Sequence, residues 1–191
     1  MDILNILPNR AGNLPVVAFG FATCAHRNQR REYTGEPYVT HCASVARTVA
    51  ECGGSPEAIA AAMMHDVLED TEVTAEEMRA VFGEKVTALV LEVTDVSRPG
   101  DGNRAVRKAL DREHLARTSP EGATIKLADL IDNTASIVEH DKGFARSYLD
   151  EKGLALEVLK HGNPELWERA YSVLQDAQLK LVQARLDGGH A

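Results

Sequence analysis

The apolar residues of this sequence recur three or four positions apart, as in helices, rather than at the alternating spacing of strands. In one segment Val39, Cys42, Val45, Ala46 and Val49 share a single helical face. Aromatic residues, which favour strands, make up only 5% of the chain. The sequence therefore predicts an all-α fold.

Capping residues, prolines and glycines divide this pattern into separate helices. Ser55 is a predicted N-cap ahead of a proline, and Thr74 with Glu77 forms a predicted capping box. Ser119 and Asn163 also precede prolines and open later helices. The predicted helices span residues 15–29, 39 to just before Gly53, 56–66, 75–82, 84–93, 103–117, 120 to beyond 133, 144–161 and 164–186.

Length and charge limit what this chain can be. A chain of 191 residues with 44% hydrophobic content can bury a full core, and we expect one domain over residues 1–191. A formal charge of −8 argues against a general nucleic-acid or anionic-membrane surface. The sequence has no apolar run of about 18 residues and no signal-peptide pattern, so we expect no membrane partner.

The cysteines indicate a reducing compartment. Cys24, Cys42 and Cys52 are odd in number and lack the C-x-x-C spacing, which suggests neither a disulfide framework nor a zinc ribbon. We therefore expect a cytoplasmic protein.

One apolar segment, residues 56–64, runs directly into a cluster of ionisable side chains. On a continuous helix, His65 lies one turn before Glu69, and Asp66 lies one turn before Asp70. Unpaired ionised groups beside buried apolar residues are costly. A bound divalent cation would relieve that cost.

Two more polar residues interrupt apolar patterns elsewhere. His41 lies on the apolar-faced second helix, and Asp129 lies inside the apolar run 127–131. Taken singly, each is more simply read as a hydrogen-bonded core histidine or a carboxylate bridging two helices. Together with His65 and Asp66 they form a mixed nitrogen and oxygen ligand set that suits manganese, iron or zinc. Such a site acidifies water and neutralises phosphoryl oxygens, so hydrolysis of a phosphate ester is the natural inference.

The order of these residues resembles that of the HD phosphohydrolases. Longer strings are similar to the hydrolase domain of the RelA/SpoT proteins and to the stand-alone small alarmone hydrolases, including the metazoan SpoT homologue. These strings are His26-x-x-Gln29-Arg30-Arg31, Gly35-Glu36-Pro37-Tyr38-x-x-His41, His65-Asp66-Val67-Leu68-Glu69-Asp70-Thr71 and Lys126-Leu127-Ala128-Asp129. They fall within residues 15–150, and residues 151–187 form the last helices of the expected single HD-domain bundle.

The resemblance implies a manganese (Mn²⁺) enzyme that removes the 3′ pyrophosphate from guanosine tetra- and pentaphosphate, a small-molecule nucleotide. It assigns the metal ligands to His41, His65, Asp66 and Asp129. Glu69 and Asp70 would orient and deprotonate the attacking water. The alternatives are a solvated acidic helix end and a capping role for Asp70 and Thr71.

The resemblance also implies substrate contacts. Arg31 would pack against the purine, and Asn133 and Tyr148 would contact the nucleoside. Several basic residues after the glycine-rich loop would neutralise the diphosphate. These are Arg104, Arg107, Lys108 and Arg112. The alternatives are a solvated charge for Arg31, an ordinary polar helix residue for Asn133 and a packing tyrosine for Tyr148. For the basic residues after the loop, the alternative is a plain basic helix face.

The chain departs from the family pattern near these contacts. Glu32 stands where small hydrolases usually carry a lysine, and Leu130 stands where a basic residue usually follows Asp129. Another nucleotide substrate, such as NADPH, pApp or a 5′ mononucleotide, therefore stays open. A non-catalytic nucleotide sensor is a further alternative, other divalent metals fit the same ligands, and the oligomeric state is open.

Overall fold

A computed structural model describes residues 10–188, except for the side chains of residues 10–12, 135, 138, 142 and 184–188. Residues 1–9, which belong to the region expected to carry no signal peptide, and residues 189–191 lie outside this part. The described residues form helices and no strand beyond one isolated bridge between Arg30 and Pro37. The all-helical prediction is confirmed.

The chain divides into two compact units, Met1–Asp95 and Val96–Ala191. The single domain expected over residues 1–191 stays a prediction, and each unit is described by itself below.

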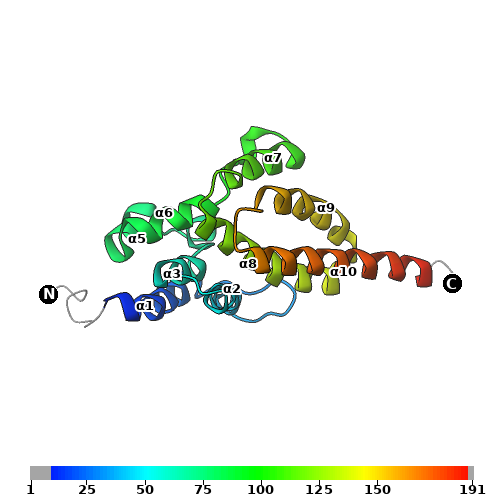
Figure 1. Ribbon diagram of the computed structural model, residues 1–191. Coiled ribbons are helices and arrows are strands. Elements are labelled where there is room, and N and C mark those ends of the chain that lie inside the picture. The colour runs from blue at the N-terminus through cyan, green and yellow to red at the C-terminus, as the bar shows by residue number, and fades with distance from the viewer. Residues whose placement is uncertain (1–9, 189–191) are drawn as a thin grey trace. The chain divides into compact units, whose positions relative to one another are not determined.

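The first unit is built around a short apolar helix. Its helices are α1 (Arg10–Ala25), α2 (Val39–Glu51), α3 (Pro56–Met63), α4 (Val67–Asp70), α5 (Ala75–Phe82) and α6 (Glu84–Val93). Helix α3 packs against α1, α2 and α6 (Figure 1). Its Ala60, Ala61 and Ala62 are completely buried, because small side chains let three helices approach one backbone. This packing holds the C-terminal end of α3 in the core.

The predicted caps of this unit are present. The Ser55 hydroxyl accepts a hydrogen bond from the Ala58 N–H, and Thr74 and Glu77 form a complete capping box. Helix α1 differs from the prediction, since it starts at Arg10 with Pro15 as its sixth residue and ends at Ala25. Its end comes early because residues 26–29 form tight turns, in which the Gln29 N–H donates to the His26 carbonyl.

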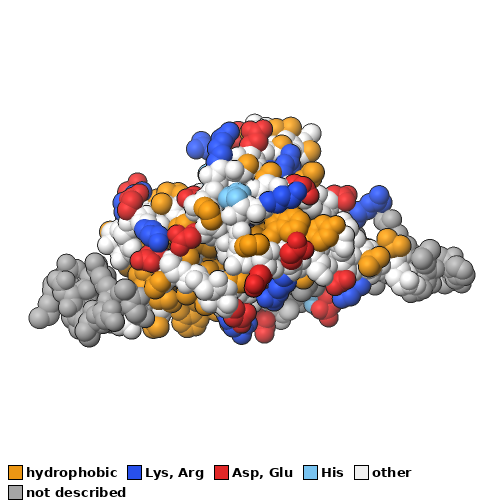
Figure 2. Space-filling model, viewed as in Figure 1, with side chains coloured by type: hydrophobic (Ala, Val, Ile, Leu, Met, Phe, Trp, Pro, Cys, Tyr) orange, Lys and Arg blue, Asp and Glu red, His pale blue; other side chains and the backbone are white. Residues whose placement is uncertain are grey.

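Hydrophobic side chains also gather on the outer face of α1 (Figure 2). Val16 is 70% exposed and Phe19 is 45% exposed, so this helix turns only part of its apolar surface towards α2 and α3.

The second unit contains a 3₁₀ turn, η2 (Pro99–Asp101), and helices α7 (Arg104–Leu115), α8 (Pro120–His140), α9 (Lys142–Val158) and α10 (Pro164–Gly188). Helix α10 packs against α8 and α9, and α7 packs against α9. Asn163 caps α10, because its side-chain oxygen accepts the Leu166 N–H. Observed helix ends in this unit lie within a few residues of the predicted ones. Among the described residues, no helix combines the length and apolarity that crossing a membrane requires.

Candidate functional site

Three of the four predicted metal ligands lie together in the first unit. His41, His65 and Asp66 each offer one ligand atom, and these atoms all lie within 4.8 Å of one another. His41 Nε2 is 3.2 Å from His65 Nε2 and 3.5 Å from Asp66 Oδ2. The two imidazoles are 1% exposed and Asp66 is 8% exposed. The residues therefore form a buried nitrogen and oxygen group that can hold a metal ion.

His65 and Asp66 converge because the helix breaks between them and the preceding core segment. The prediction of one helix from residue 56 through 66 is wrong: α3 ends at Met63, and residues 64–66 form a turn before α4. Consecutive side chains on a regular helix point about 100° apart, so a continuous helix separates neighbouring ligands. In the turn, His65 Nε2 lies 3.0 Å from Asp66 Oδ2. The expected relation between Asp66 and Asp70 holds, since the Asp70 N–H donates to the Asp66 carbonyl.

The hydrogen bonding of His65 suits a metal ligand. Its Nδ1 lies 2.8 Å from the Ala62 carbonyl oxygen, which only accepts, so Nδ1 carries the proton. In the neutral ring Nε2 is then a lone-pair atom, and it faces a carboxylate oxygen of Asp66 at 3.0 Å. Two acceptors at this distance repel each other unless a proton or cation lies between them. The donor set therefore fits a divalent cation, and the Ala62 contact is the usual support of a ligating histidine.

Tyr38 supports the same carboxylate, although the sequence motif that contains it predicted no role for this residue. Its hydroxyl donates to Asp66 Oδ2 at 2.7 Å, and its ring lies 5.5 Å from the His41 ring, centroid to centroid. Tyr38 precedes the first residue of α2. The signal in the sequence was the spacing of Tyr38 and His41, which places the tyrosine one turn before a predicted ligand.

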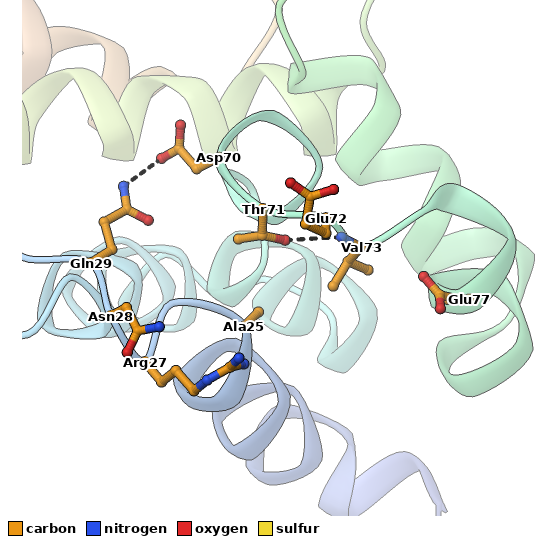
Figure 3. Close-up of a pocket in the computed structure, with 9 residues that line it drawn as sticks. All are labelled: Ala25, Arg27, Asn28, Gln29, Asp70, Thr71, Glu72, Val73 and Glu77. Carbon is orange, nitrogen blue, oxygen red and sulfur yellow. Dashed lines mark hydrogen bonds between the residues drawn. The ribbon is translucent and has the colours of Figure 1, made fainter.

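The predicted catalytic pair, Glu69 and Asp70, is exposed on α4. Glu69 Oε1 accepts the Asp95 N–H at 2.6 Å, and Asp95 is the second residue after α6. Asp70 Oδ2 accepts from Gln29 Nε2 at 2.9 Å. Asp70 and Gln29 line a cavity of about 610 Å³, and Figure 3 shows their side chains facing each other across this hydrogen bond. Each carboxylate thus accepts a hydrogen bond from a residue outside α4, and this bond orients it.

Arg31 lies in the polar loop predicted between the first two helices. Its N–H donates to the Glu36 carbonyl, and its own carbonyl accepts the Gly35 N–H. Gly35 adopts a φ of 71°, which favours glycine in this tight turn. Arg31 is half-buried and Glu32 is exposed.

In the second unit, Asp129 lies on α8 and is 4% exposed. Asn133 Nδ2 donates to Asp129 Oδ1 at 2.6 Å, which confirms that these residues share one face of the helix. Lys126 Nζ lies 3.2 Å from Asp129 Oδ2. No role for Lys126 was predicted from the sequence, although its position three residues before Asp129 indicates that the two side chains are neighbours on a helix.

Tyr148 lies on α9 and is 5% exposed. Burial raises the pKa of its hydroxyl, and the negative charge of Asp129 adds to the rise. Thr134 lies nearby, but its hydroxyl donates to the Leu130 carbonyl, and the Tyr148 oxygen has no hydrogen-bond partner of acceptable geometry in the described part of the chain. The hydroxyl therefore stays protonated as an unused donor.

The basic residues of α7 differ in their contacts. Arg104 makes a two-point interaction with Glu151, at 2.7 and 2.8 Å. Lys108 lies 3.2 Å from Asp111. Arg107 is half-buried, and its Nε is buried without a hydrogen-bond partner among the described residues. Arg107 is thus the member of this group with an unused buried donor.

Comparison with known proteins matches residues 18–150 to the family described as HD domain. A guanosine-3′,5′-bis(diphosphate) 3′-pyrophosphohydrolase of Aquifex aeolicus is 37% identical over 120 residues, 63% of this chain and 17% of that protein. The protein of that activity named MESH1 in Danio rerio is 40% identical over 117 residues, 59% of this chain and 63% of that protein. The chain therefore spans less than two thirds of either relative.

A solved structure is similar over most of the chain. It is described as a metazoan ortholog of SpoT that hydrolyses ppGpp, and it matches with a TM-score of 0.78 and 27% sequence identity. The match covers 89% of this chain and 97% of that one.

Proposed function

Because the chain belongs to the HD-domain family, we propose that it is a metal-dependent phosphohydrolase that removes the 3′ pyrophosphate from guanosine tetra- and pentaphosphate. One observation carries the proposal: the ligand atoms of His41, His65 and Asp66 lie within 4.8 Å of one another in a buried setting. The names of the relatives from Aquifex aeolicus and Danio rerio support the choice of substrate.

In this proposal His41, His65 and Asp66 hold the cation, and Asp129 stays a proposed fourth ligand on the strength of its motif. Manganese is the proposed metal, and the same ligands accept iron or zinc. When bound, the cation supplies Lewis acidity towards water and a phosphoryl oxygen. The protonated Nδ1 of His65 keeps its other nitrogen in the ligating form.

Glu69 and Asp70 are the proposed residues that orient water and accept its proton. Asp70 Oδ2 is occupied by Gln29, which leaves Oδ1 without a hydrogen bond from the described residues and able to accept one from water. The oxygen of that water attacks the phosphorus bonded to the 3′ oxygen. The bond between that phosphorus and the 3′ oxygen breaks, the 3′ oxygen takes up a proton, and pyrophosphate leaves with GDP or GTP.

The proposed substrate contacts follow the chemistry of each side chain. The Arg31 guanidinium stacks on the purine, and the protonated Tyr148 hydroxyl donates to the nucleoside. Asn133 contacts the ribose, and the unused Nε of Arg107 binds a phosphate oxygen.

A hydrolysis assay tests the proposal directly. Purified protein is incubated with manganese and ppGpp, and the release of pyrophosphate and GDP is measured against a His65→Ala variant. We expect release only with wild-type protein and metal. Wild-type protein that releases no more than the variant contradicts the proposal, and tight nucleotide binding without turnover indicates a sensor instead.

A second candidate substrate is another nucleotide, and the exposed acid Glu32 beside Arg31 favours it. An acidic side chain next to the proposed purine contact repels a highly phosphorylated ligand. NADPH, pApp and a 5′ mononucleotide are the compounds to compare with ppGpp. The true substrate has the largest kcat/KM.

We also propose a cytoplasmic location and no nucleic-acid partner. Cys24, Cys42 and Cys52 are free thiols in the structure, which supports a reducing compartment. The formal charge of −8 supports the second statement.

A further inference from the structure

His26 and Gln29, which follow α1, are linked to Asp70 by hydrogen bonds. Asp70 lies 41 positions after Gln29 in the sequence. Gln29 Nε2 donates to Asp70 Oδ2 at 2.9 Å, and the two side chains face each other in the lining of the cavity (Figure 3). Behind it, His26 Nδ1 lies 2.6 Å from Gln29 Oε1. These contacts form a hydrogen-bond network from the buried imidazole of His26 through the amide of Gln29 to the exposed carboxylate of Asp70.

The Asp70 carboxylate fixes the direction of the hydrogen bonds in this network. An ionised carboxylate only accepts hydrogen bonds, so the amide nitrogen of Gln29 faces Asp70 and its oxygen faces His26. That oxygen only accepts, so His26 Nδ1 carries a proton. Asp70 thus determines the orientation of Gln29, and Gln29 determines the tautomer of the neutral His26 ring.

The other nitrogen of His26 is left without a partner. His26 is 3% exposed, and its Nε2 is buried with no hydrogen-bond partner among the described residues. An apolar ring of the same shape would avoid this unsatisfied atom. The imidazole therefore costs the fold free energy, and its useful contact is the one that Nδ1 makes with Gln29.

We propose that His26 and Gln29 are positioning residues that hold the Asp70 carboxylate in the orientation needed to accept a proton from the attacking water. This inference rests on the proposed function and extends it. Asp70 is exposed at the end of a helix of four residues, so its own backbone restrains the side chain little. The bond from Gln29 selects one carboxylate orientation before water binds, and His26 prevents the amide from rotating away.

His26 also connects this hydrogen-bond network to the proposed metal ligands. Its ring lies 5.0 Å from the Tyr38 ring, centroid to centroid, and the Tyr38 hydroxyl donates to Asp66. The segment between α1 and α2 therefore supports both a proposed ligand and the proposed proton acceptor.

Matched variants test the inference. Gln29→Leu removes the donor to Asp70, and His26→Phe keeps a ring against Tyr38 but removes Nδ1. We expect both to lower kcat by about 10- to 100-fold with KM changed by less than about twofold, because orientation acts on the chemical step. Manganese affinity, measured by calorimetry, stays unchanged. Asn28→Leu is the control, since Asn28 lines the same cavity but takes no part in the hydrogen bond between Gln29 and Asp70, and its kcat stays within about twofold.

Stability and rescue separate positioning from simple damage to the fold. His26→Phe removes both the unsatisfied Nε2 and the bond from Nδ1 to Gln29, two effects of opposite sign, so we expect its melting temperature to stay within a few degrees of the wild type while kcat falls. His26→Asn keeps an N–H donor close to the position of Nδ1, and we expect it to restore most of the lost kcat. A wild-type kcat in His26→Phe, or equal losses of kcat in the Asn and Phe variants, overturns the role of His26.

A double-mutant cycle shows whether Gln29 acts through Asp70. In an Asp70→Asn background, Gln29→Leu is expected to lower kcat by less than about twofold, because the carboxylate it positions is already gone. An equal fold-loss in both backgrounds overturns the inference. An active wild type with an unaffected Gln29→Leu variant contradicts this inference alone, whereas a wild type that hydrolyses none of the nucleotides contradicts the proposed function as well.

Discussion

The Tyr38 hydroxyl donates a 2.7 Å hydrogen bond to Asp66 Oδ2, the oxygen that also lies 3.0 Å from the His65 ring. One carboxylate oxygen thus faces a neutral donor on one side and a lone-pair nitrogen on the other. The hydroxyl fixes the carboxylate rotamer, and this leaves the imidazole side of the oxygen for a cation.

Removal of this donor is expected to weaken metal binding. Tyr38→Phe keeps the ring contacts and loses the bond to Asp66, so we expect manganese affinity to fall by about 10-fold, as for other residues that orient metal ligands. Calorimetric titration with manganese measures the change. Tyr171→Phe is a control on an exposed tyrosine of α10 and keeps wild-type affinity. Equal affinities in Tyr38→Phe and wild type contradict the role of the hydroxyl.

Metal binding is expected to stabilise the fold through His65. At a manganese concentration 100 times Kd, linkage adds about 2.7 kcal/mol to the free energy of unfolding, or roughly 5–10 °C in Tm for a chain of this size. A chelator reverses the gain. Thermal unfolding of wild type and His65→Ala with and without manganese measures it, and a similar Tm gain in the variant argues against the site.

Tyr148 is expected to affect substrate binding without contributing to stability. Its hydroxyl is buried without a hydrogen-bond partner in the part of the chain that the structure describes, and burial raises its pKa, so it is a protonated donor at neutral pH. Tyr148→Phe removes an unsatisfied group, and we expect an unchanged or higher Tm. If the hydroxyl donates to the nucleoside, KM rises by about 2- to 10-fold, the value of one hydrogen bond. Steady-state kinetics decide between this role and simple packing.

Asp111 is expected to make the second unit sensitive to acid. Burial alone would raise the pKa of Asp111, but hydrogen bonds from the Ser97 backbone and side chain and from Lys108 hold it below the ordinary value of 3.8. The stabilisation is therefore complete above that ordinary value and is lost as the pH falls through the lower pKa of the folded state.

Asp111→Asn tests this pH dependence. At pH 7 we expect the variant to lose about 2–3 kcal/mol of unfolding free energy, because a buried charged hydrogen-bond acceptor is replaced. The difference from wild type shrinks near pH 3. Urea unfolding at both pH values measures it, and a difference that is independent of pH contradicts the assignment to the ionised carboxylate.

Gly162 is expected to be a packing requirement of the second unit. A Cβ at this position would lie 2.9 Å from Leu127 Cδ1 and 3.1 Å from the Thr124 nitrogen. We expect Gly162→Ala to destabilise the protein by about 1–3 kcal/mol, the usual cost of overpacking. Gly153→Ala, in the open on α9, is the matched control and is expected to be neutral or to stabilise by up to about 1 kcal/mol. Chemical unfolding of both variants checks the contrast.

Local features of the fold were predictable because their causes are local. Ser55, Thr74 with Glu77, and Asn163 cap their helices as predicted, since a cap satisfies backbone groups only three residues away. The end of α3 was not predictable in this way. Its apolar pattern continues through residue 64, and the turn that breaks it before His65 carries no glycine or proline.

The sequence by itself determined the kinds of ligand atom, the helical fold and the spacing of Asp129 and Asn133, because composition and helical periodicity are properties of short stretches. Only the tertiary structure decided that His41 lies beside His65 and that Gln29 reaches Asp70 across 41 positions. Such contacts depend on how α1, α2 and α3 pack against one another. That packing is set by the fit of many buried side chains, which no single motif records.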